Sequence, residues 1–277
     1  MAREFNMEDG GRVLVLSAEE GMVAHMARGE CVIGVMDGHV PPPLPSGCYL
    51  VEEEESVDAD LVDRVYARFC HKPWKIGENE NLVLREFTAE DIADLYRLEQ
   101  GMRPCKDISG ILGDLPDTAW KDLTEAGQQE YAGRLASYIE HRYAFYEYGL
   151  WGIYHKPEEK LIGMCGFSTT DEVDMSLGYY VFPTYRRYGY ATQSCRMAMD
   201  FVRDWIRAEE VFAVIDKENL ASQSIIFTLD FTQIKDDGQR LHFRKDLTEG
   251  AKEPEQKDAG ALWDRLKSAA GKYFRRS

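Results

Sequence analysis

The 277-residue sequence is short of basic residues. It contains 33 lysines and arginines against 49 aspartates and glutamates, so its formal net charge at pH 7 is −16. A nucleic-acid-binding surface needs a concentration of basic side chains, whereas long-range electrostatics draw cationic or neutral partners toward an acidic protein. The composition therefore argues against nucleic acid as a partner.

Long uninterrupted apolar runs are also lacking. A membrane-spanning helix needs roughly 20 consecutive apolar residues, and a secretory signal peptide needs an apolar core near the N-terminus. No stretch of the sequence reaches that length, and the opening segment MAREFNMEDGGR contains no such core. We expect no membrane span and a cytoplasmic location.

Closely spaced cysteines are absent as well. Without a Cys-x-x-Cys pair, the sequence indicates neither a zinc site nor a disulfide framework, and reduced thiols fit the expected compartment. We expect no metal, and we expect each cysteine to be a small core residue. The cysteines are Cys31, Cys48, Cys70, Cys105, Cys165 and Cys195.

Residues 1–75 predict a small α/β domain. Short β-branched runs alternate with segments of helical periodicity, which is typical of a sheet with parallel strands. The predicted elements are strands at 12–17, 31–37 and 48–53 and helices at 18–29 and 58–70, followed by a linker at 72–81.

The glycine fingerprint of dinucleotide-binding folds is missing from this first domain. Gly10 and Gly11 precede its first strand, whereas the fingerprint follows a strand and opens a helix. A structural or regulatory role is therefore favoured over ligand binding, and which of these roles the domain has is open.

Residues 80–248 predict a larger α+β domain. Several strands follow one another with only tight turns between them, which favours a mixed, mostly antiparallel sheet flanked by helices. The predicted strands are 82–88, 150–156, 160–169, 172–182, 210–216 and a pair within 231–247 that turns at Asp237-Gly238; the predicted helices are 89–101, 122–149, 192–206 and 219–229.

The C-terminal tail, 249–277, has two parts. Residues 249–258 are polar and predict a solvated linker, whereas 259–277 can form an amphipathic helix with basic residues off its apolar face. This helix can dock on its own domain, on a partner protein or on an anionic membrane surface, and the sequence leaves all three open.

The segment RRYGYA (186–191), between a predicted strand and a predicted helix, is the most informative in the chain. Gly189 and the small Ala191 allow the backbone to approach a ligand, and the first-turn amides of the helix that follows are unpaired donors. Arg186 and Arg187 add cationic donors beside them. The segment therefore predicts an anion site that suits a pyrophosphate.

About 30 residues downstream, Asn219 opens another helix directly after a strand, as a good N-cap residue. In the order and spacing of these elements, the chain from about Leu82 to Leu247 resembles the GNAT superfamily of acetyltransferases. LGYYVFPTYRRYGYAT is similar to the family's fourth strand and its R/Q-x-x-G-x-G/A acetyl-CoA loop, and NLASQSIIFTLDF is similar to its N-x-x-S/A helix. The nearest subgroup by appearance includes ribosomal-protein N-terminal acetyltransferases and spermidine acetyltransferases.

The resemblance implies a GNAT-like fold and an acetyl-CoA site. In that family the fourth strand splays from the fifth, so the pantetheine arm pairs with exposed strand backbone. The implied contacts are Tyr180, Val181 and Phe182 along the pantetheine, Arg186, Arg187, Tyr188, Gly189, Tyr190 and Ala191 at the pyrophosphate, and Asn219 and Ser222 at the thioester end.

The usual general base and acid of the family are not present. Ser176 stands where many relatives carry a glutamate, and Ile226 aligns with a tyrosine acid of other branches. Asp174 lies on the same strand face as Ser176 by period-two alternation, and Glu172 is one step further. Either carboxylate is a candidate base, acting directly or through a water.

The identity of the general acid is also left open by the sequence. Positioning supplies much of the rate in a direct attack of an amine on a thioester, so few side chains are required. Ser222 or a nearby tyrosine is a candidate acid; Tyr179 and Tyr180 alternate across the strand, so one faces the acetyl group while the other packs in the core. The candidate catalytic residues are Asp174, Ser176, Tyr179 and Ser222.

Three histidines and one cysteine are alternative candidates for the catalytic acid, base or nucleophile, and we favour them less. His141, His155 and His242 flank the expected cleft, but a lone histidine is more often packed or at the surface. Cys195, near the start of a helix, has no partner histidine close in sequence.

We expect an N-acetyltransferase that moves acetyl from the cosubstrate acetyl-CoA to a primary amine by direct attack in a ternary complex. The acceptor is a protein or peptide N-terminus, an amino acid or a polyamine, and a homodimer is open. Segment 102–149 is expected to wall the acceptor side, although a solvated helical face explains its acidic residues equally well. These are Glu125, Glu130, Glu140 and Glu147.

Two other functions compete with this one. The first is a catalytically silent acetyl-CoA-binding sensor, which Ser176 and Ile226 keep open. The second, weaker reading makes the N-terminal domain the functional binding domain and the rest its scaffold.

Overall fold

The structure is a computed structural model that describes residues 3–17, 21–36, 49–103, 108, 110–169 and 175–248. Two compact units make up the chain. Unit 1 comprises Met1–Trp74, Glu86–Ile92 and Glu125–Glu147, and unit 2 comprises Lys75–Arg85, Ala93–Thr124 and Tyr148–Ser277. The boundary predicted between 75 and 80 falls near the end of the first segment of unit 1, but two later segments cluster with that segment. The predicted C-terminal helix lies outside the described residues.

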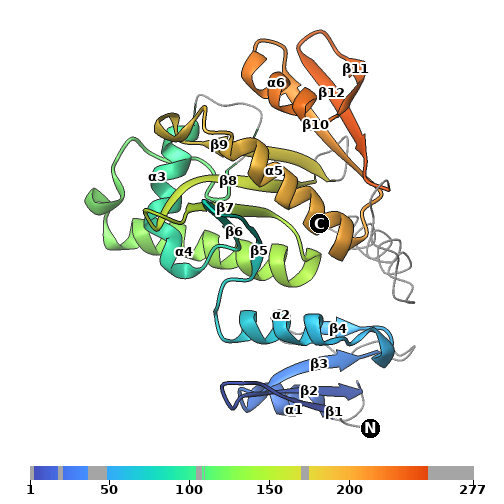
Figure 1. The fold of residues 1–277 in the computed structure, drawn as a ribbon. Helices are drawn as coiled ribbons and strands as arrows, with labels where there is room; N and C mark the ends of the chain where they lie inside the picture. The colour runs from blue at the N-terminus through green and yellow to red at the C-terminus, as the bar shows by residue number, and fades with distance from the viewer. Residues whose placement is uncertain are drawn as a thin grey trace. The chain divides into compact units, whose positions relative to one another are not determined.

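Unit 1 contains a four-stranded sheet in the order β1-β2-β3-β4, with β1 antiparallel to β2 and the other three strands parallel (Figure 1). Alternate residues of β2 enter two apolar clusters, one with residues of helix α2 and one with Met22 of helix α1. Both faces of the strand are therefore buried, as its unbroken apolar sequence predicts. The elements are β1 (Arg3–Asn6), β2 (Arg12–Ser17), α1 (Met22–Ala27), β3 (Cys31–Val35), β4 (Tyr49–Val51) and α2 (Ala59–Phe69).

The later segments of unit 1 are helical. A capping box of Thr88 and Asp91 precedes α3, and helix α4 (Glu125–Tyr138) continues into a π-helical stretch, Ile139–Tyr146. The single helix predicted over 122–149 is thus two helical forms in succession, and it ends at Glu147 in left-handed geometry.

Unit 2 is built on an eight-stranded sheet in the order β11-β12-β10-β9-β8-β7-β6-β5. All neighbouring strands are antiparallel except β9 and β10, which confirms the predicted mixed, mostly antiparallel sheet. The strands are β5 (Lys75–Glu78), β6 (Leu82–Arg85), β7 (Leu150–His155), β8 (Lys160–Ser168), β9 (Ser176–Val181), β10 (Glu210–Asp216), β11 (Thr232–Asp236) and β12 (Arg240–Asp246).

The linker predicted at 72–81 is wrong in part, because β5 lies inside it and pairs with β6. The predicted hairpin at Asp237-Gly238 is confirmed: Asp237 accepts backbone hydrogen bonds from Gln239 and Arg240, and Gly238 has a φ of 97°. Such a positive φ is readily adopted by glycine.

The helices of unit 2 position the site. Helix α5 (Tyr190–Phe201), which ends in a π-helical turn, Val202–Ile206, lies across one face of the sheet over β5, β6, β8 and β9 (Figure 1). Beneath it, buried Trp151 packs edge-on against Phe167 and Phe201. The other helices are α3 (Ile92–Met102), which is in unit 2 except for its first residue, and α6 (Leu220–Thr228) beside β10. Within the described ranges, no helix is long and apolar enough to cross a membrane.

Candidate active site

Strands β9 and β10 meet at one end only. Their single register pair joins Ser176 to Phe212, where the Phe212 N–H also donates to the Met175 carbonyl at 3.1 Å. Beyond Ser176, β9 stays paired with β8 as far as Val181. A wedge therefore opens between β9 and β10, and this wedge exposes one backbone edge of β9.

Backbone alternation decides which groups face the wedge. The Phe182 N–H donates to Ile162 of β8 at 2.9 Å, and the Phe182 carbonyl accepts from Tyr185 at 2.9 Å. Alternate residues of an antiparallel strand direct their backbone groups to opposite edges, so Tyr180 also faces β8, whereas Tyr179 and Val181 face the wedge. The expectation that Phe182 offers its backbone to pantetheine is corrected, because the Phe182 N–H and the Phe182 carbonyl already have hydrogen-bond partners.

The loop after β9 converges on the start of α5. Arg187 and Gly189 have φ values of 69° and 76°, and Gly189 is the N-cap residue of α5 without a side-chain cap. The first hydrogen bond of the helix runs from Gln193 N–H to the Gly189 carbonyl, at 3.0 Å. The N–H groups of Tyr190 and the next two residues are thus unpaired within the helix, at its positive dipole end. This arrangement fits a phosphate group.

Aromatic and basic side chains hold this loop in place. Arg186 donates from Nε to the Val181 carbonyl at 2.9 Å, with its guanidinium 5.4 Å from the Tyr180 ring centroid. Tyr188, which is 65% exposed, stacks on Tyr190 at 5.5 Å. Tyr190 in turn shares a 3.2 Å hydrogen bond with Nε2 of His155. His155 therefore supports the loop from β7.

Helix α6 reaches the wedge from the β10 side. The Tyr179 hydroxyl donates to the Ser222 carbonyl at 3.1 Å, and the Asn219 side chain caps α6 by accepting from the Ser222 N–H at 3.1 Å. The structure thus brings three of the predicted site residues, Tyr179, Asn219 and Ser222, together.

The remaining candidates have different outcomes. Ser176 is buried at the closed end of the wedge. Asp174 and Glu172 lie outside the described residues. The Sγ of buried Cys195 is 3.7 Å from that of Cys165, and burial, followed by this contact, raises the pKa of the Cys195 thiol well above its usual value. A nucleophilic thiolate is not expected there.

The other two histidines are tied to local structure. His242 is buried and shares a 3.1 Å hydrogen bond with Asp237, and His141 bonds to the Ser137 carbonyl one helical turn earlier. In the parts of the chain with described coordinates, no group of three or more histidine, cysteine or acidic side chains is arranged to hold a metal.

Two acidic residues expected on the acceptor wall are paired within unit 1. Glu130 binds Arg134 at 2.6 Å, and Glu147 binds Arg64 at 3.1 Å. The first is a surface pair on one helix and the second is largely buried, so both support the reading of these acids as structural.

Sequence reasoning missed Glu99. This residue of α3 is only 5% exposed, and burial raises the pKa of its carboxyl to about 7 despite hydrogen bonds from two backbone N–H groups. The available signal was its spacing, because Leu95 and Met102 at i−4 and i+3 place Glu99 on the apolar face of α3. A carboxylate on such a face is unusual.

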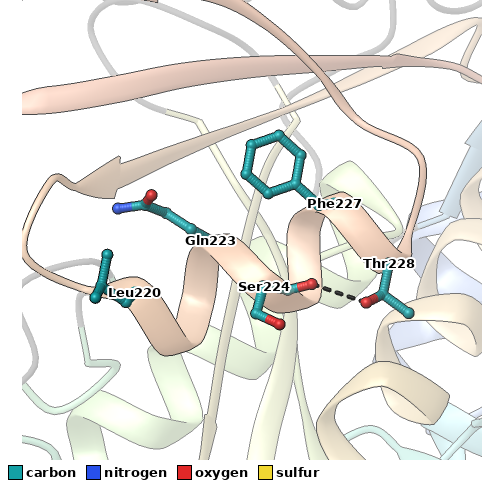
Figure 2. A pocket seen from close by; sticks show the side chains of 5 residues that line it. All are labelled: Leu220, Gln223, Ser224, Phe227 and Thr228. Atoms are coloured by element: carbon teal, nitrogen blue, oxygen red, sulfur yellow. Dashed lines mark hydrogen bonds between the residues drawn. The ribbon is translucent and has the colours of Figure 1, made fainter.

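A hollow of about 550 Å³ lies along α6. Figure 2 shows the side chains that line it. Leu220 and Phe227, which border it, are 71% and 55% exposed. The Thr228 hydroxyl donates to the Ser224 carbonyl at 2.8 Å, so it is engaged with its own helix. All five lining residues come from α6, and none of them is among the residues named at the wedge.

A family model described as an acetyltransferase (GNAT) domain matches residues 81–232, which is more than half of the chain. An acetyltransferase from Agrobacterium tumefaciens str. C58 is similar at 16% identity and a TM-score of 0.47, covering 62% of this chain and 94% of its own.

Two further solved structures are similar over the same fraction of the chain. The ribosomal-protein-S5-alanine acetyltransferase of Vibrio fischeri shows 15% identity and a TM-score of 0.46, with 64% of this chain and 98% of its own covered. RimL, a ribosomal L7/L12 α-N-protein acetyltransferase, shows 14% identity and a TM-score of 0.48, with coverages of 64% and 96%.

Proposed function

The chain belongs to the GNAT family of acetyltransferases and is an acetyl-CoA-dependent acyltransferase; from this premise we propose that it transfers acetyl to a primary amine by direct attack in a ternary complex. The observation that carries the proposal is the wedge between β9 and β10, with the unpaired amides of α5 beside it. The acceptor classes are a protein or peptide N-terminus, an amino acid and a polyamine.

Acetyl-CoA is assigned to this wedge. The Val181 N–H and the backbone of Tyr179 on the β10-facing edge of β9 would bind the pantetheine arm, whereas the Val181 carbonyl already accepts from Arg186. Residues 186–191 would hold the pyrophosphate, with Arg186 and Arg187 as cationic donors and Tyr188 as an exposed aromatic surface. Asn219 and Ser222 would lie at the thioester end, where α6 reaches the wedge. A bound thioester would supply an activated acetyl group.

The chain's own groups then orient the reaction. A backbone N–H at the edge of β9 would polarise the acetyl carbonyl, which is the largest electrostatic contribution expected of a site of this type. The Tyr179 proton is directed to the Ser222 carbonyl, so the Ser222 hydroxyl is the better candidate for protonating the leaving thiolate. Ser176 and Asp174 remain candidates on the β9 side.

The catalytically silent sensor is the competing reading, and family membership does not favour it. A turnover assay distinguishes the enzyme from the sensor, since a sensor binds acetyl-CoA but releases no thiol when an amine is added.

Homodimerisation and a cytoplasmic location remain proposals. Size-exclusion chromatography with light scattering would test the first, and cell fractionation would test the second.

The experiment that tests the cosubstrate site is isothermal titration of acetyl-CoA into the wild type and Gly189→Glu. The new side chain repels a pyrophosphate and disfavours the left-handed backbone at φ 76°, so binding should weaken by at least about 100-fold. Gly133→Glu is the matched control, because it adds the same charge on α4, where a side chain meets no neighbour within 4 Å. A folded wild type that binds no acetyl-CoA contradicts the proposal.

A further inference from the structure

A small cavity of about 250 Å³ lies at the C-terminal end of α3. Glu99 and Met102 of α3 form one side together with Arg103, which directly follows the helix, and residues further along the segment after the helix form the other. The lining residues of that segment are Ile108, Gly110, Gly113, Asp114 and Leu115. The cavity is therefore local to unit 2, which also contains the wedge.

The Glu99 carboxylate is held in a fixed orientation in this cavity. Its Oε1 accepts from the Ile111 N–H at 2.5 Å, and its Oε2 accepts from the Leu112 N–H at 3.0 Å. A carboxylate has about four acceptor positions, so these bonds leave capacity for another donor. Gly110 lies directly against the carboxylate, and a side chain at that position would collide with it.

The cavity adjoins the middle of β9. Ile108, which lines the cavity, packs where a side chain of Gly178 would be, at 3.1 Å from the ideal Cβ position. The Tyr180 hydroxyl donates to the Gly101 carbonyl in the last turn of α3 at 2.8 Å. Ser176, Gly178 and Tyr180 share one face of β9 by alternation, and this is the face that meets α3.

Among the described residues that line the cavity, no other charged group is paired with Glu99. Arg103 forms an ion pair with Asp117 and donates to the Pro116 carbonyl at 2.6 Å. Asp114 is the second acid of the cavity wall, and it is exposed. The cavity thus offers a fixed carboxylate with spare acceptor capacity beside the strand that borders the wedge.

We propose that Glu99 binds the ammonium group of the acceptor in this cavity and takes one of its protons, directly or through one water. This inference rests on the proposed function and assigns the base that the sequence left open. It also specifies the acceptor as an amine that is cationic in solution.

The proton and electron balance is complete without another reactant. The ammonium gives one proton to the Glu99 carboxylate, and the freed nitrogen lone pair forms the C–N bond to the acetyl carbon. The C–S bond breaks with its electron pair on sulfur. The Ser222 hydroxyl protonates the thiolate and takes in turn the second proton that the nitrogen loses. Glu99 then returns its proton to solvent. A carboxyl with a pKa of about 7 is suited to this exchange near neutral pH.

The test is the pH dependence of kcat/KM for CoA-thiol release, measured with spermidine and with a short peptide that has a free N-terminus. For the wild type we expect activity to rise through pH 7. In Glu99→Gln, whose amide oxygen can still accept from Ile111, activity at pH 7 should fall by about 100-fold or more. The remaining activity should rise only as the pH approaches the pKa of the acceptor amine.

Three controls separate this proposal from the alternatives. Asp94→Asn removes an exposed acid from the same helix and should leave the profile unchanged. Glu99→Asp retains a carboxyl and should keep a rise near neutral pH at reduced rate. Acetyl-CoA titration into Glu99→Gln should give the wild-type Kd, because the cavity is separate from the pyrophosphate loop.

The outcomes are distinguishable. If Glu99→Gln keeps the wild-type pH profile and the wild-type kcat/KM, then Glu99 merely fixes the loop at Ile111 and the inference is overturned while the proposed function stands. If the wild type binds acetyl-CoA but acetylates neither probe nor any other amine, the proposed function fails and the role of Glu99 fails with it.

Discussion

Tyr179 and Tyr180 are neighbours in the chain, yet their hydroxyls bond to opposite sides of the sheet. Tyr179 donates to the Ser222 carbonyl of α6, and Tyr180 donates to the Gly101 carbonyl of α3. Strand alternation imposes this division. One residue therefore ties β9 to the helix at the thioester end, and the next ties it to the helix that carries Glu99.

Tyr179→Phe should cost about 1 kcal/mol in the free energy of unfolding, because the hydrogen bond from the Tyr179 hydroxyl to the Ser222 carbonyl is lost while the ring still packs. Urea denaturation of the variant and the wild type measures this difference. A midpoint identical to that of the wild type would mean that the bond contributes nothing to stability.

Glu99 should make stability depend on pH. Its carboxyl pKa is about 7 in the folded chain, above the ordinary value of 4.5, so the folded state binds more protons than the unfolded state between these values. The contribution of Glu99 to stability is therefore greatest at acid pH and falls as pH rises from about 4.5 to 7. Relative to Glu99→Gln, the wild type should lose on the order of 2 to 3 kcal/mol across that range.

Urea unfolding of both proteins at pH 5 and pH 8 measures the effect, and the difference between them removes the contribution of all other groups. A difference that is the same at both pH values, or that grows in favour of the wild type at pH 8, would contradict the raised pKa.

At this scale the sequence predicted local features better than distant ones. The Asn219 cap follows from side-chain chemistry within a few residues, and the structure contains it. Gly189, which was predicted to let the backbone approach a ligand, is the N-cap residue of α5 in left-handed geometry. Glu99 could not be assigned from the sequence, because its burial depends on residues 108 and 110–115, of which Ile111 and Leu112 donate to its carboxylate. Ile226 is a buried core residue, consistent with the absence of a side-chain role there.

At the scale of elements, the proposed acetyl-CoA site depends on the wedge between β9 and β10. It arises because the parallel strands β9 and β10 share a single register pair; α5 packs on β9, and α6 packs on β10. Strand types were predictable from apolar runs, whereas β5 was read as a linker because its four residues, KIGE, carry little apolar pattern. Pairing with β6, a tertiary effect, creates that strand.

Acetyl-CoA binding should slow amide hydrogen exchange at the wedge in a residue-specific way. The Val181 and Ala191 amides should be protected by at least about tenfold at saturating acetyl-CoA, because they gain acceptors on binding. The Phe182 amide should change little, since it already donates to Ile162.

Exchange followed by NMR, or by mass spectrometry with residue-level fragmentation, gives this comparison. New protection at Phe182 without protection at Val181 would show that the backbone assignment of the wedge is wrong.

At the scale of the whole molecule, the chain does not divide into consecutive domains. Unit 1 gathers its three segments around buried ion pairs, in which Arg68 binds Glu86 at 2.5 Å and Arg64 binds Glu147 at 3.1 Å. Each pair joins α2 to a later segment of the same unit. The sequence shows where strands and helices begin, but it contains no local signal for contacts between residues so far apart.

Glu86→Gln should destabilise the protein by up to about 3 kcal/mol, because the buried Arg68 loses its nearer counterion and keeps only Glu147, at 3.8 Å. Glu130→Gln is the matched control, since it removes the exposed partner of Arg134 on α4 and should change stability by no more than about 0.5 kcal/mol. Thermal and urea unfolding of both variants measure the effect. Equal stability of the two variants would contradict a structural role for the Arg68–Glu86 pair.

The central claim is that the wedge of unit 2 presents acetyl-CoA to an amine. Its most direct test is the release of free CoA thiol from acetyl-CoA, followed with a panel of polyamines, amino acids and peptides with free N-termini, together with mass analysis of the amine. We predict thiol release that requires an amine, matches the acetylated product one for one, and is lost in Gly189→Glu. Binding of acetyl-CoA with no amine-dependent thiol release from any member of the panel would contradict the claim.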